Sequence, residues 1–251
     1  MARDMPYRVI LPAGYSALKQ RQPGYPVIYL LHGLTGHFNN WTDKTRLAEY
    51  AASHNFIIVT PEGNDGWYTD SSRVPTDKYE SYIVNELIPE IDKNFRTIAD
   101  RDHRAIAGLS MGGFGSIKFG LKYPEMFSLV GSFSGALFAS TYKSAEQLPP
   151  GNIRTSLVAI FGEGGGPVQK ASDITAIVRD ATADKIKTFP YFYLSCGTED
   201  FLFQNNRDFV GVLNDKKVPH EYREHPGVHD WIFWDDQVRE FLTLADRRLK
   251  N

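Results

Sequence analysis

Short apolar segments alternate with longer amphipathic ones along most of the chain, and this alternation restricts the fold more than any other feature of the sequence. The apolar segments are mostly continuous and rich in β-branched and aromatic residues, as is typical of strands buried on both faces of a parallel sheet. Repeated strand–helix units require right-handed crossovers, so we predict an α/β fold whose mostly parallel sheet carries helices on both faces. The predicted strands are residues 6–11, 26–31, 56–61, 104–109, 127–134, 189–196 and 220–225, and the predicted helices are 42–53, 79–95, 112–122, 202–216 and 231–248.

The chain of 251 residues is long enough for one large α/β domain, and no linker rich in proline or serine divides it. One region departs from the alternation, because residues 137–188 contain QLPPGN and GEGGGP and only one clear helix pattern, at 169–180. The glycine run lacks the Gly-Lys-Ser/Thr that grips phosphate, so a plain loop is favoured there. We therefore expect a single domain, 1–251, in which 137–188 is an insertion that forms a lid or a pocket wall.

The composition argues against several classes of partner. The formal net charge is −2 and no dense run of lysine and arginine is present, so we expect no nucleic-acid binding. No apolar run reaches transmembrane length, and we expect no membrane association. The single cysteine, Cys196, excludes an internal disulfide and is expected to be buried rather than reactive. As written, the chain predicts a cytoplasmic protein; secretion stays open if a leader was removed, and so does the oligomeric state.

The sequence GLSMG at residues 108–112 places a serine between two glycines, after the predicted strand 104–109 and before a helix. A G-x-S-x-G motif in this context is typical of a sharp turn that presents a nucleophilic serine at the carboxyl edge of a sheet. Such a turn strains the backbone of the serine, and Gly108 and Gly112 leave room where side chains would clash. We therefore predict Ser110 as a nucleophile rather than as part of a flexible loop.

A serine nucleophile needs a base to remove its proton and an acid to orient that base, and in this turn architecture the chain order is serine, acid, histidine. The strand at 189–196 ends in a turn that carries Glu199 and Asp200, and the sequence HPGVHDW follows the last strand. We prefer Asp200 as the acid because a short carboxylate suits the turn. We prefer His229 as the base because His225 ends the strand. The alternative for either acid is to cap the following helix.

The two histidines of HPGVH have the spacing of a zinc site on a helix, but the intervening proline and glycine exclude a helix there. We therefore predict no metal, and the expected chemistry requires no cofactor.

Acyl chemistry also needs N–H donors that stabilise a negatively charged oxygen. One is expected from the backbone of Met111, directly after the serine. The other is expected from Leu34, because YLLHGLTG places a strand end and a turn there, with His32 bracing the turn.

Aromatic residues gather beside the predicted reactive loops. The segment after the third strand contains Trp67 and Tyr68, and Trp231 begins the last predicted helix. An aromatic rim suits a phenolic acyl group or the face of a sugar, and we predict these three residues as substrate contacts on the rim of the pocket. The alternative is that they pack in the core, since most large aromatic side chains are buried.

Five segments together, LLHGLTGHFNNW, LIPEIDKNF, IAGLSMGGFGS, CGTEDFL and GVHDW, resemble the putative-esterase branch of the α/β-hydrolases. That branch contains tributyrin-type esterases, feruloyl and acetyl-xylan esterases, esterase D (S-formylglutathione hydrolase) and the mycolyltransferases. The resemblance runs from about Tyr7 to Trp234 and is weakest in 137–188. It implies an α/β-hydrolase fold. It also implies the roles of five residues: Ser110, Asp200 and His229 as the catalytic triad, and the N–H groups of Leu34 and Met111 as the oxyanion hole.

These features predict a serine esterase that transfers an acyl group to water through an acyl-enzyme. We expect the substrate to be a small-molecule or saccharide-linked ester with a short-chain or aromatic, feruloyl-like acyl group. The nearest alternative is a thioesterase of the S-formylglutathione type, and a less favoured one is a non-catalytic member that binds carbohydrate or a partner. Acyl transfer to a sugar also stays open. Substrate choice is expected to depend on 137–188, where the resemblance is weakest.

Overall fold

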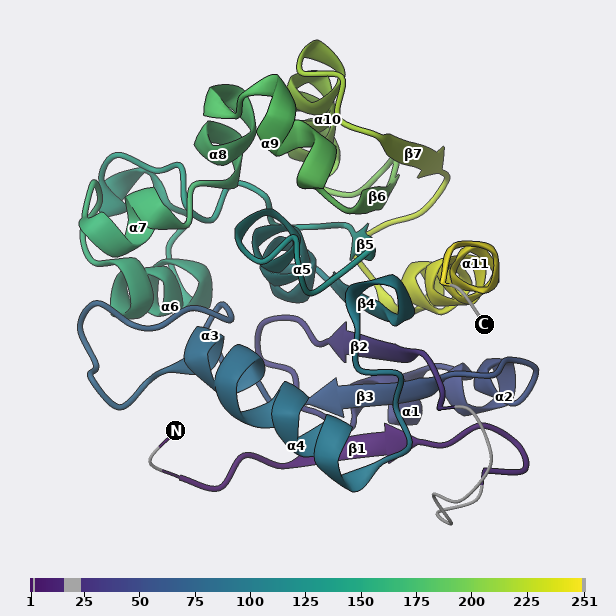
Figure 1. Ribbon diagram of the computed structural model, residues 1–251. Helices are drawn as coiled ribbons and strands as arrows, with labels where there is room; N and C mark the ends of the chain where they lie inside the picture. Colours follow the sequence, from purple (N-terminus) through teal and green to yellow (C-terminus); the bar gives the residue numbers. More distant parts are fainter. Residues whose placement is uncertain (2, 16–23, 250–251) are drawn as a thin grey trace.

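The computed structural model describes residues 1, 3–15 and 24–249 and contains a seven-stranded sheet with the order β1-β3-β2-β4-β5-β6-β7 (Figure 1). Strand β1 pairs antiparallel with β3, and every other neighbouring pair is parallel. The strands are β1 (Tyr7–Ile10), β2 (Val27–Leu31), β3 (Ile57–Pro61), β4 (Arg104–Leu109), β5 (Leu129–Phe133), β6 (Tyr191–Gly197) and β7 (His220–His225). All of the predicted strands are confirmed, and those at 104–109 and 220–225 have the predicted bounds.

The helical segments that join the strands lie on both faces of the sheet. They are α1 (Asn40–Lys44), α2 (Leu47–Ala51), α3 (Tyr79–Ser81), η1 (Tyr82–Leu87), α4 (Ile88–Asn94), η2 (Arg101–His103), α5 (Met111–Lys122), η3 (Ala145–Gln147), α6 (Asn152–Phe161), α7 (Pro167–Ala171), α8 (Ile174–Asp180), α9 (Ala183–Thr188), α10 (Phe203–Asp215) and α11 (Trp231–Arg248). None of the helices in these described residues is long and apolar enough to cross a membrane.

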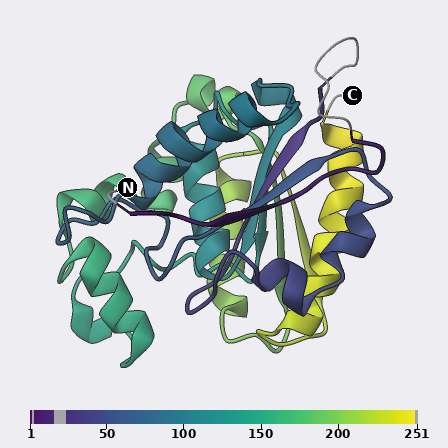
Figure 2. The same ribbon diagram turned by 90° about the horizontal axis from the view of Figure 1, so that it is seen from below.

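Each face of the sheet carries its own hydrophobic core, because successive side chains of a strand point to opposite faces. In β2, Val27, Tyr29 and Leu31 face one core, and Ile28 and Leu30 face the other. The first core lies against α4, α5 and α10, and the second against α1, α2 and α11 (Figure 2). Burial on both faces explains why the strands read as continuous apolar runs.

Two predicted helices differ from the structure in detail. The segment predicted at 42–53 is two short helices, α1 and α2, separated by Thr45 in an extended conformation. The Thr45 hydroxyl accepts a hydrogen bond from the N–H of Leu47 at 3.1 Å, a local bond that competes with a continuous helix. The segment predicted at 79–95 is helical over 79–94, but its middle part, η1, is a π-helix.

The prediction of a single helix in 137–188 is wrong, because this region contains the four helices α6 to α9. The predicted helix 169–180 is broken into α7 and α8 where Asp173 caps α8, its carboxylate accepting from the N–H of Ala176 at 2.9 Å. Helix α6 buries Leu157, Ile160 and Phe161 at helical spacing. That apolar pattern is short and ends at glycines on both sides, so it is only a weak signal for a helix.

Candidate active site

Ser110 lies in the turn that joins β4 to α5, at the carboxyl edge of the sheet. Its backbone has φ 52° and ψ −115°, a conformation that residues other than glycine rarely adopt. The flanking glycines make this turn possible. A Cβ added to Gly108 would lie 2.6 Å from the backbone of Gly112, and a Cβ on Gly112 would lie 2.6 Å from carbonyl oxygens at the end of β2. The Ser110 N–H also donates to the carbonyl of Phe133 at 2.9 Å, which ties the turn to β5.

The structure brings His229 and Asp200 to this serine from two other loops. Ser110 Oγ lies 3.0 Å from Nε2 of His229, and Nδ1 of His229 lies 2.8 Å from Oδ2 of Asp200. Because the carboxylate accepts from Nδ1–H, the lone pair of Nε2 faces the serine hydroxyl. Asp200 follows β6 and His229 lies between β7 and α11, so both come from the carboxyl ends of parallel strands.

The Asp200 side chain is fully buried, and its second oxygen accepts from the N–H of Leu202 at 2.8 Å. Burial raises the pKa of a carboxyl group, but the hydrogen bonds from His229 and Leu202 outweigh it and hold the pKa of Asp200 below its usual value. The group is therefore ionised at neutral pH. An ionised Asp200 orients the imidazole and stabilises a positive charge on it.

The other two residues weighed in the sequence lie outside this arrangement. Glu199 is exposed, and its carboxylate accepts from the N–H of Gly227 at 2.7 Å, which fixes the loop that carries His229. His225 ends β7, and its Nε2 lies 3.9 Å from Glu240. Cys196 is buried as predicted, and burial raises the pKa of its thiol to about 12.

The two predicted N–H donors flank Ser110. Met111 begins α5, and the first N–H groups of a helix have no partner within the helix. Leu34 follows Gly33 in the loop after β2. A Cβ added to Gly33 would lie 3.5 Å from the Cβ of Ser110, so this loop passes directly beside the serine. Leu34 and Ser110 also line the same pocket.

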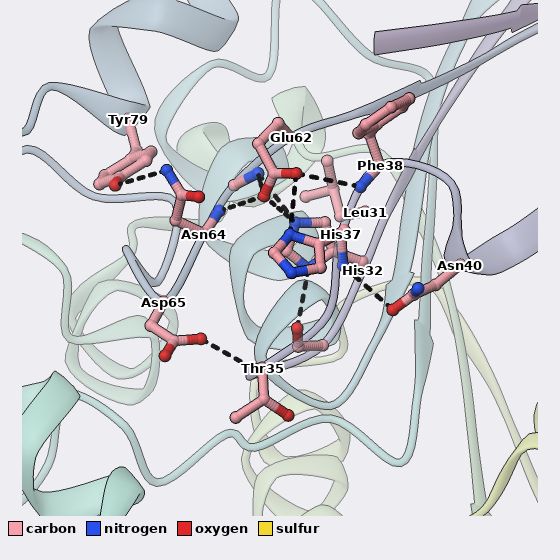
Figure 3. A network of polar contacts seen from close by, with 12 residues as sticks. Leu31, His32, Thr35, His37, Phe38, Asn40, Glu62, Asn64, Asp65 and Tyr79 are labelled. Atoms are coloured by element: carbon pink, nitrogen blue, oxygen red, sulfur yellow. Dashed lines mark hydrogen bonds and ion pairs between the residues drawn. The ribbon is translucent and has the colours of Figure 1, made fainter. Parts of the chain in front are cut away.

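A polar network that the sequence analysis missed links the loops after β2 and β3 (Figure 3). At its centre is Glu62, which directly follows β3 and is 5% exposed. The carboxylate lies 3.2 Å from His32 Nε2 and from His37 Nδ1, and accepts from the N–H of Asn64 at 2.7 Å. Burial opposes ionisation, but the contact with His32 and the hydrogen bonds from the N–H groups of Asn64 and Phe38 hold the pKa of Glu62 at about 2. The sequence feature that could have pointed to Glu62 is a carboxylate directly after a buried strand.

A pocket of about 410 Å³ opens over Ser110. Trp67 and Trp231, two of the three predicted substrate contacts, both line it. Trp67 is only 1% exposed, so it lies in the wall of the pocket and not on its rim, where it was predicted. The Trp67 indole donates to Ser156 on α6 at 2.9 Å. The rim position predicted for Tyr68 is wrong, since this residue is fully buried and its hydroxyl donates to the His32 carbonyl at 3.1 Å. Neighbouring side chains of a tight turn, here Trp67 and Tyr68, point in different directions, and the sequence pattern does not show which of them faces the pocket.

Other lining residues were not indicated by the sequence. Phe138 and Ile153 come from the 137–188 region, so this region forms part of the pocket wall. Phe201 and Trp234 enclose His229, with ring centroids 4.7 and 4.9 Å from the imidazole. Phe201 is 68% exposed despite this contact. These side chains hold the imidazole in place and give the pocket a mainly apolar surface.

Comparison with known proteins gives a consistent set of matches. A family model described as "Putative esterase" matches residues 1–243. The acetyl esterase of Caldicellulosiruptor saccharolyticus is 30% identical over 217 residues, which cover 84% of this chain and 79% of that protein. The Staphylococcus aureus fluorophosphonate-binding serine hydrolase FphF superposes with a TM-score of 0.83 at 27% identity, over 95% of this chain and 91% of that one. A ferulic acid esterase superposes with a TM-score of 0.79 at 29% identity, over 98% and 93% of the two chains.

Proposed function

The chain belongs to the putative esterase family and has the α/β-hydrolase fold, and we propose that it is a serine carboxylester hydrolase that uses Ser110, His229 and Asp200 as its triad. The observation that carries this assignment is the hydrogen-bond chain from Asp200 through the imidazole to Ser110, with lengths of 2.8 and 3.0 Å. That chain provides a nucleophile, a base and an orienting acid in the geometry that acyl transfer requires.

In the proposed reaction, Ser110 Oγ attacks the ester carbonyl while Nε2 of His229 takes its proton. The N–H groups of Leu34 and Met111 stabilise the negative charge on the tetrahedral intermediate. His229 then gives the proton to the leaving alcohol, and the acyl-enzyme forms. A water molecule, deprotonated by the same histidine, hydrolyses the acyl-enzyme and releases the acid. No cofactor enters these steps.

For the substrate we propose esters with a short-chain or aromatic acyl group, on a small alcohol or a saccharide. A pocket of about 410 Å³ admits such a group but no long chain folded inside it. Its apolar lining by Trp67, Phe138 and Ile153 suits an acyl chain or a phenyl ring. The names of two relatives, an acetyl esterase and a ferulic acid esterase, agree with this class.

We also propose that the chain acts as one domain in which 137–188 is a pocket wall rather than a mobile lid. Three hydrogen bonds attach α6 to the loop after β3. The Trp67 indole donates to Ser156, and Ser71 and Ser72 bond to the last turn of the helix at 2.7 and 2.8 Å. A wall anchored in this way keeps Ile153 at a constant distance from Ser110.

The assignment is tested by initial rates on p-nitrophenyl acetate, p-nitrophenyl octanoate, methyl ferulate and S-formylglutathione, for the wild type and Ser110→Ala. We expect turnover of acetate or ferulate and a loss of about 1000-fold or more in the variant. Preferential turnover of S-formylglutathione would assign a thioesterase instead. Full activity in Ser110→Ala, or an inert wild type on all four compounds, would refute the esterase mechanism.

A further inference from the structure

The peptide group between Gly33 and Leu34 carries the N–H that the proposed mechanism uses, and two hydrogen bonds fix its carbonyl oxygen. The carbonyl oxygen of Gly33 accepts from Nδ1 of His32 at 2.7 Å and from the N–H of Gly36 at 3.0 Å. A trans peptide is planar, and its C=O and N–H point in opposite directions. Fixing the Gly33 carbonyl therefore fixes the direction of the Leu34 N–H.

The His32 ring is itself held at its other nitrogen (Figure 3). Nδ1 must carry a proton because it faces a carbonyl oxygen, which can only accept. Nε2 accepts from the N–H of Gly63 at 2.8 Å. Glu62 Oε1, which lies 3.2 Å from Nε2, accepts from the same N–H at 3.1 Å. The ring is 1% exposed, so no water replaces these partners. Its orientation is determined by the first residues after β3.

Glu62 forms hydrogen bonds to both loops, the one after β3 and the one after β2. Its carboxylate accepts from the N–H groups of Gly63 and Asn64 at 3.1 and 2.7 Å, which shapes its own loop. It also accepts from the N–H of Phe38 at 3.3 Å and contacts His37, which anchors the far end of the loop after β2. With a pKa of about 2, the carboxylate keeps its charge, and therefore these contacts, throughout the neutral range.

The next peptide group, between Leu34 and Thr35, is fixed by a second carboxylate. Oδ1 of Asp65 accepts from the N–H of Thr35 at 2.7 Å (Figure 3). Thr35 has φ 60°, a conformation that a β-branched residue adopts only when its surroundings impose it. The peptide group after the Leu34 Cα is thus held directly by Asp65, and the one before it by His32, whose ring is fixed by the loop after β3.

We propose that Glu62 and Asp65 are positioning residues of the esterase reaction, which aim the Leu34 N–H at the oxyanion by clamping the two peptide groups that flank it. Glu62 acts through the Gly63 N–H, which donates to both its carboxylate and His32, and Asp65 acts directly on Thr35. Neither carboxylate touches the substrate. The inference rests on the proposed function, because it assigns a purpose to these contacts only if Leu34 is an oxyanion donor.

The first test compares kcat and KM on p-nitrophenyl acetate for Glu62→Gln, Asp65→Ala and Asp65→Asn, with rates corrected for the active fraction by titration of Ser110. Loss of a whole oxyanion donor costs about 100- to 1000-fold in turnover, so a misdirected one is expected to cost about 10- to 100-fold in Glu62→Gln and about 10-fold in Asp65→Ala. KM should change less than about twofold. Asp65→Asn keeps an accepting oxygen and should restore most of the rate lost in Asp65→Ala.

A control variant separates positioning from stability. Asp173→Ala removes a carboxylate bond to the N–H of Ala176, similar in kind to that of Asp65, but at the start of α8. It should lower the melting temperature without lowering kcat per titrated site. Equal kcat in Asp65→Ala, Glu62→Gln and the wild type would overturn the proposal.

The second test uses an alkyl boronic acid, which forms a tetrahedral adduct with the serine and places an oxygen in the oxyanion hole. Across the variants its inhibition constant should rise in proportion to the fall in kcat/KM. An unchanged inhibition constant, with or without a fall in kcat, would refute the positioning role. Inactivity of the wild type, or full activity in Ser110→Ala, would instead refute the proposed function, and with it the positioning role that rests on it.

Discussion

Lys118 offers the sharpest test of what stabilises this fold, because its charge is fully buried on α5. Its ammonium group donates to the carbonyl of Tyr68 at 2.6 Å, to the hydroxyl of Thr69 at 2.7 Å and to the carboxylate of Glu80 at 2.7 Å. Burial lowers the pKa of Lys118 to about 8, against the opposing attraction of Glu80. The ion pair therefore joins α5, α3 and the turn that carries Trp67.

Replacing Lys118 by methionine keeps the aliphatic chain and removes the charge. Removing one partner of a buried ion pair costs about 3–5 kcal/mol, because the other charge stays buried without compensation. Glu80 also keeps an ion pair with Lys122 and a hydrogen bond from Tyr123 at 2.7 Å. The loss for Lys118→Met is therefore expected at the lower end, about 3 kcal/mol in the free energy of unfolding. For a chain of this length that lowers the melting temperature by about 6–12 °C.

The measurement is urea unfolding followed by tryptophan fluorescence and circular dichroism, with the slope m checked for each variant. Lys122→Met is the control, since this partly exposed partner of Glu80 should cost less than about 1 kcal/mol. Adding Glu80→Gln to Lys118→Met removes the carboxylate charge that has lost its buried partner and should recover part of the loss. A loss below about 1 kcal/mol in Lys118→Met with an unchanged m would refute the reasoning, because it would mean that the buried charge contributes nothing net.

Other expected outcomes involve Glu62, Ile153 and Cys196. The pKa of Glu62 is about 2 in the folded protein, against an ordinary value of 4.5. Between these values the unfolded chain binds a proton that the folded protein does not, so the free energy of unfolding falls as the pH drops through this range. Urea titrations near neutral pH and near pH 3.5 should show a smaller fall in Glu62→Gln than in the wild type. Ile153→Ala enlarges the pocket and should raise kcat/KM on p-nitrophenyl octanoate relative to the acetate by about threefold or more, measured side by side. The Cys196 thiol, buried with a pKa of about 12, should resist a disulfide reagent in the native protein at pH 8 and react once urea unfolds the chain.

The strands were predictable because a sheet covered on both faces demands continuous apolar runs, which few other structures require. Ser110 and the order of Asp200 and His229 were predictable for a related reason, since the turn after β4 needs Gly108 and Gly112 and the partners must follow other parallel strands. Both signals are local in the sequence.

The roles of Glu62 and Asp65 depend instead on which strands are neighbours. Strand β3 lies beside β2 in the sheet, and only that pairing brings the loop after β3 against Leu34. The fate of Tyr68 depends on backbone conformation, because Trp67 and Tyr68 both have positive φ, near 50°, and the tight turn sends one ring into the pocket and the other into the core. Neither the order of the strands nor these φ angles can be predicted from the types of the residues concerned.

Backbone strain is concentrated where the strands end at the pocket, and polar side chains hold it there. Among the described residues, six of the seven non-glycine positions with positive φ lie in the loops after β2, β3, β4 and β5: Thr35, Asn64, Trp67, Tyr68, Ser110 and Ser134. Such conformations persist only where the surroundings over-determine them. The Asp65 carboxylate does so at Thr35, and the Lys118 ammonium does so at Tyr68 through its carbonyl. The Lys118 ammonium in the core and the Asp65 carboxylate at the surface therefore serve the same end, since each fixes a strained turn that borders the pocket over Ser110.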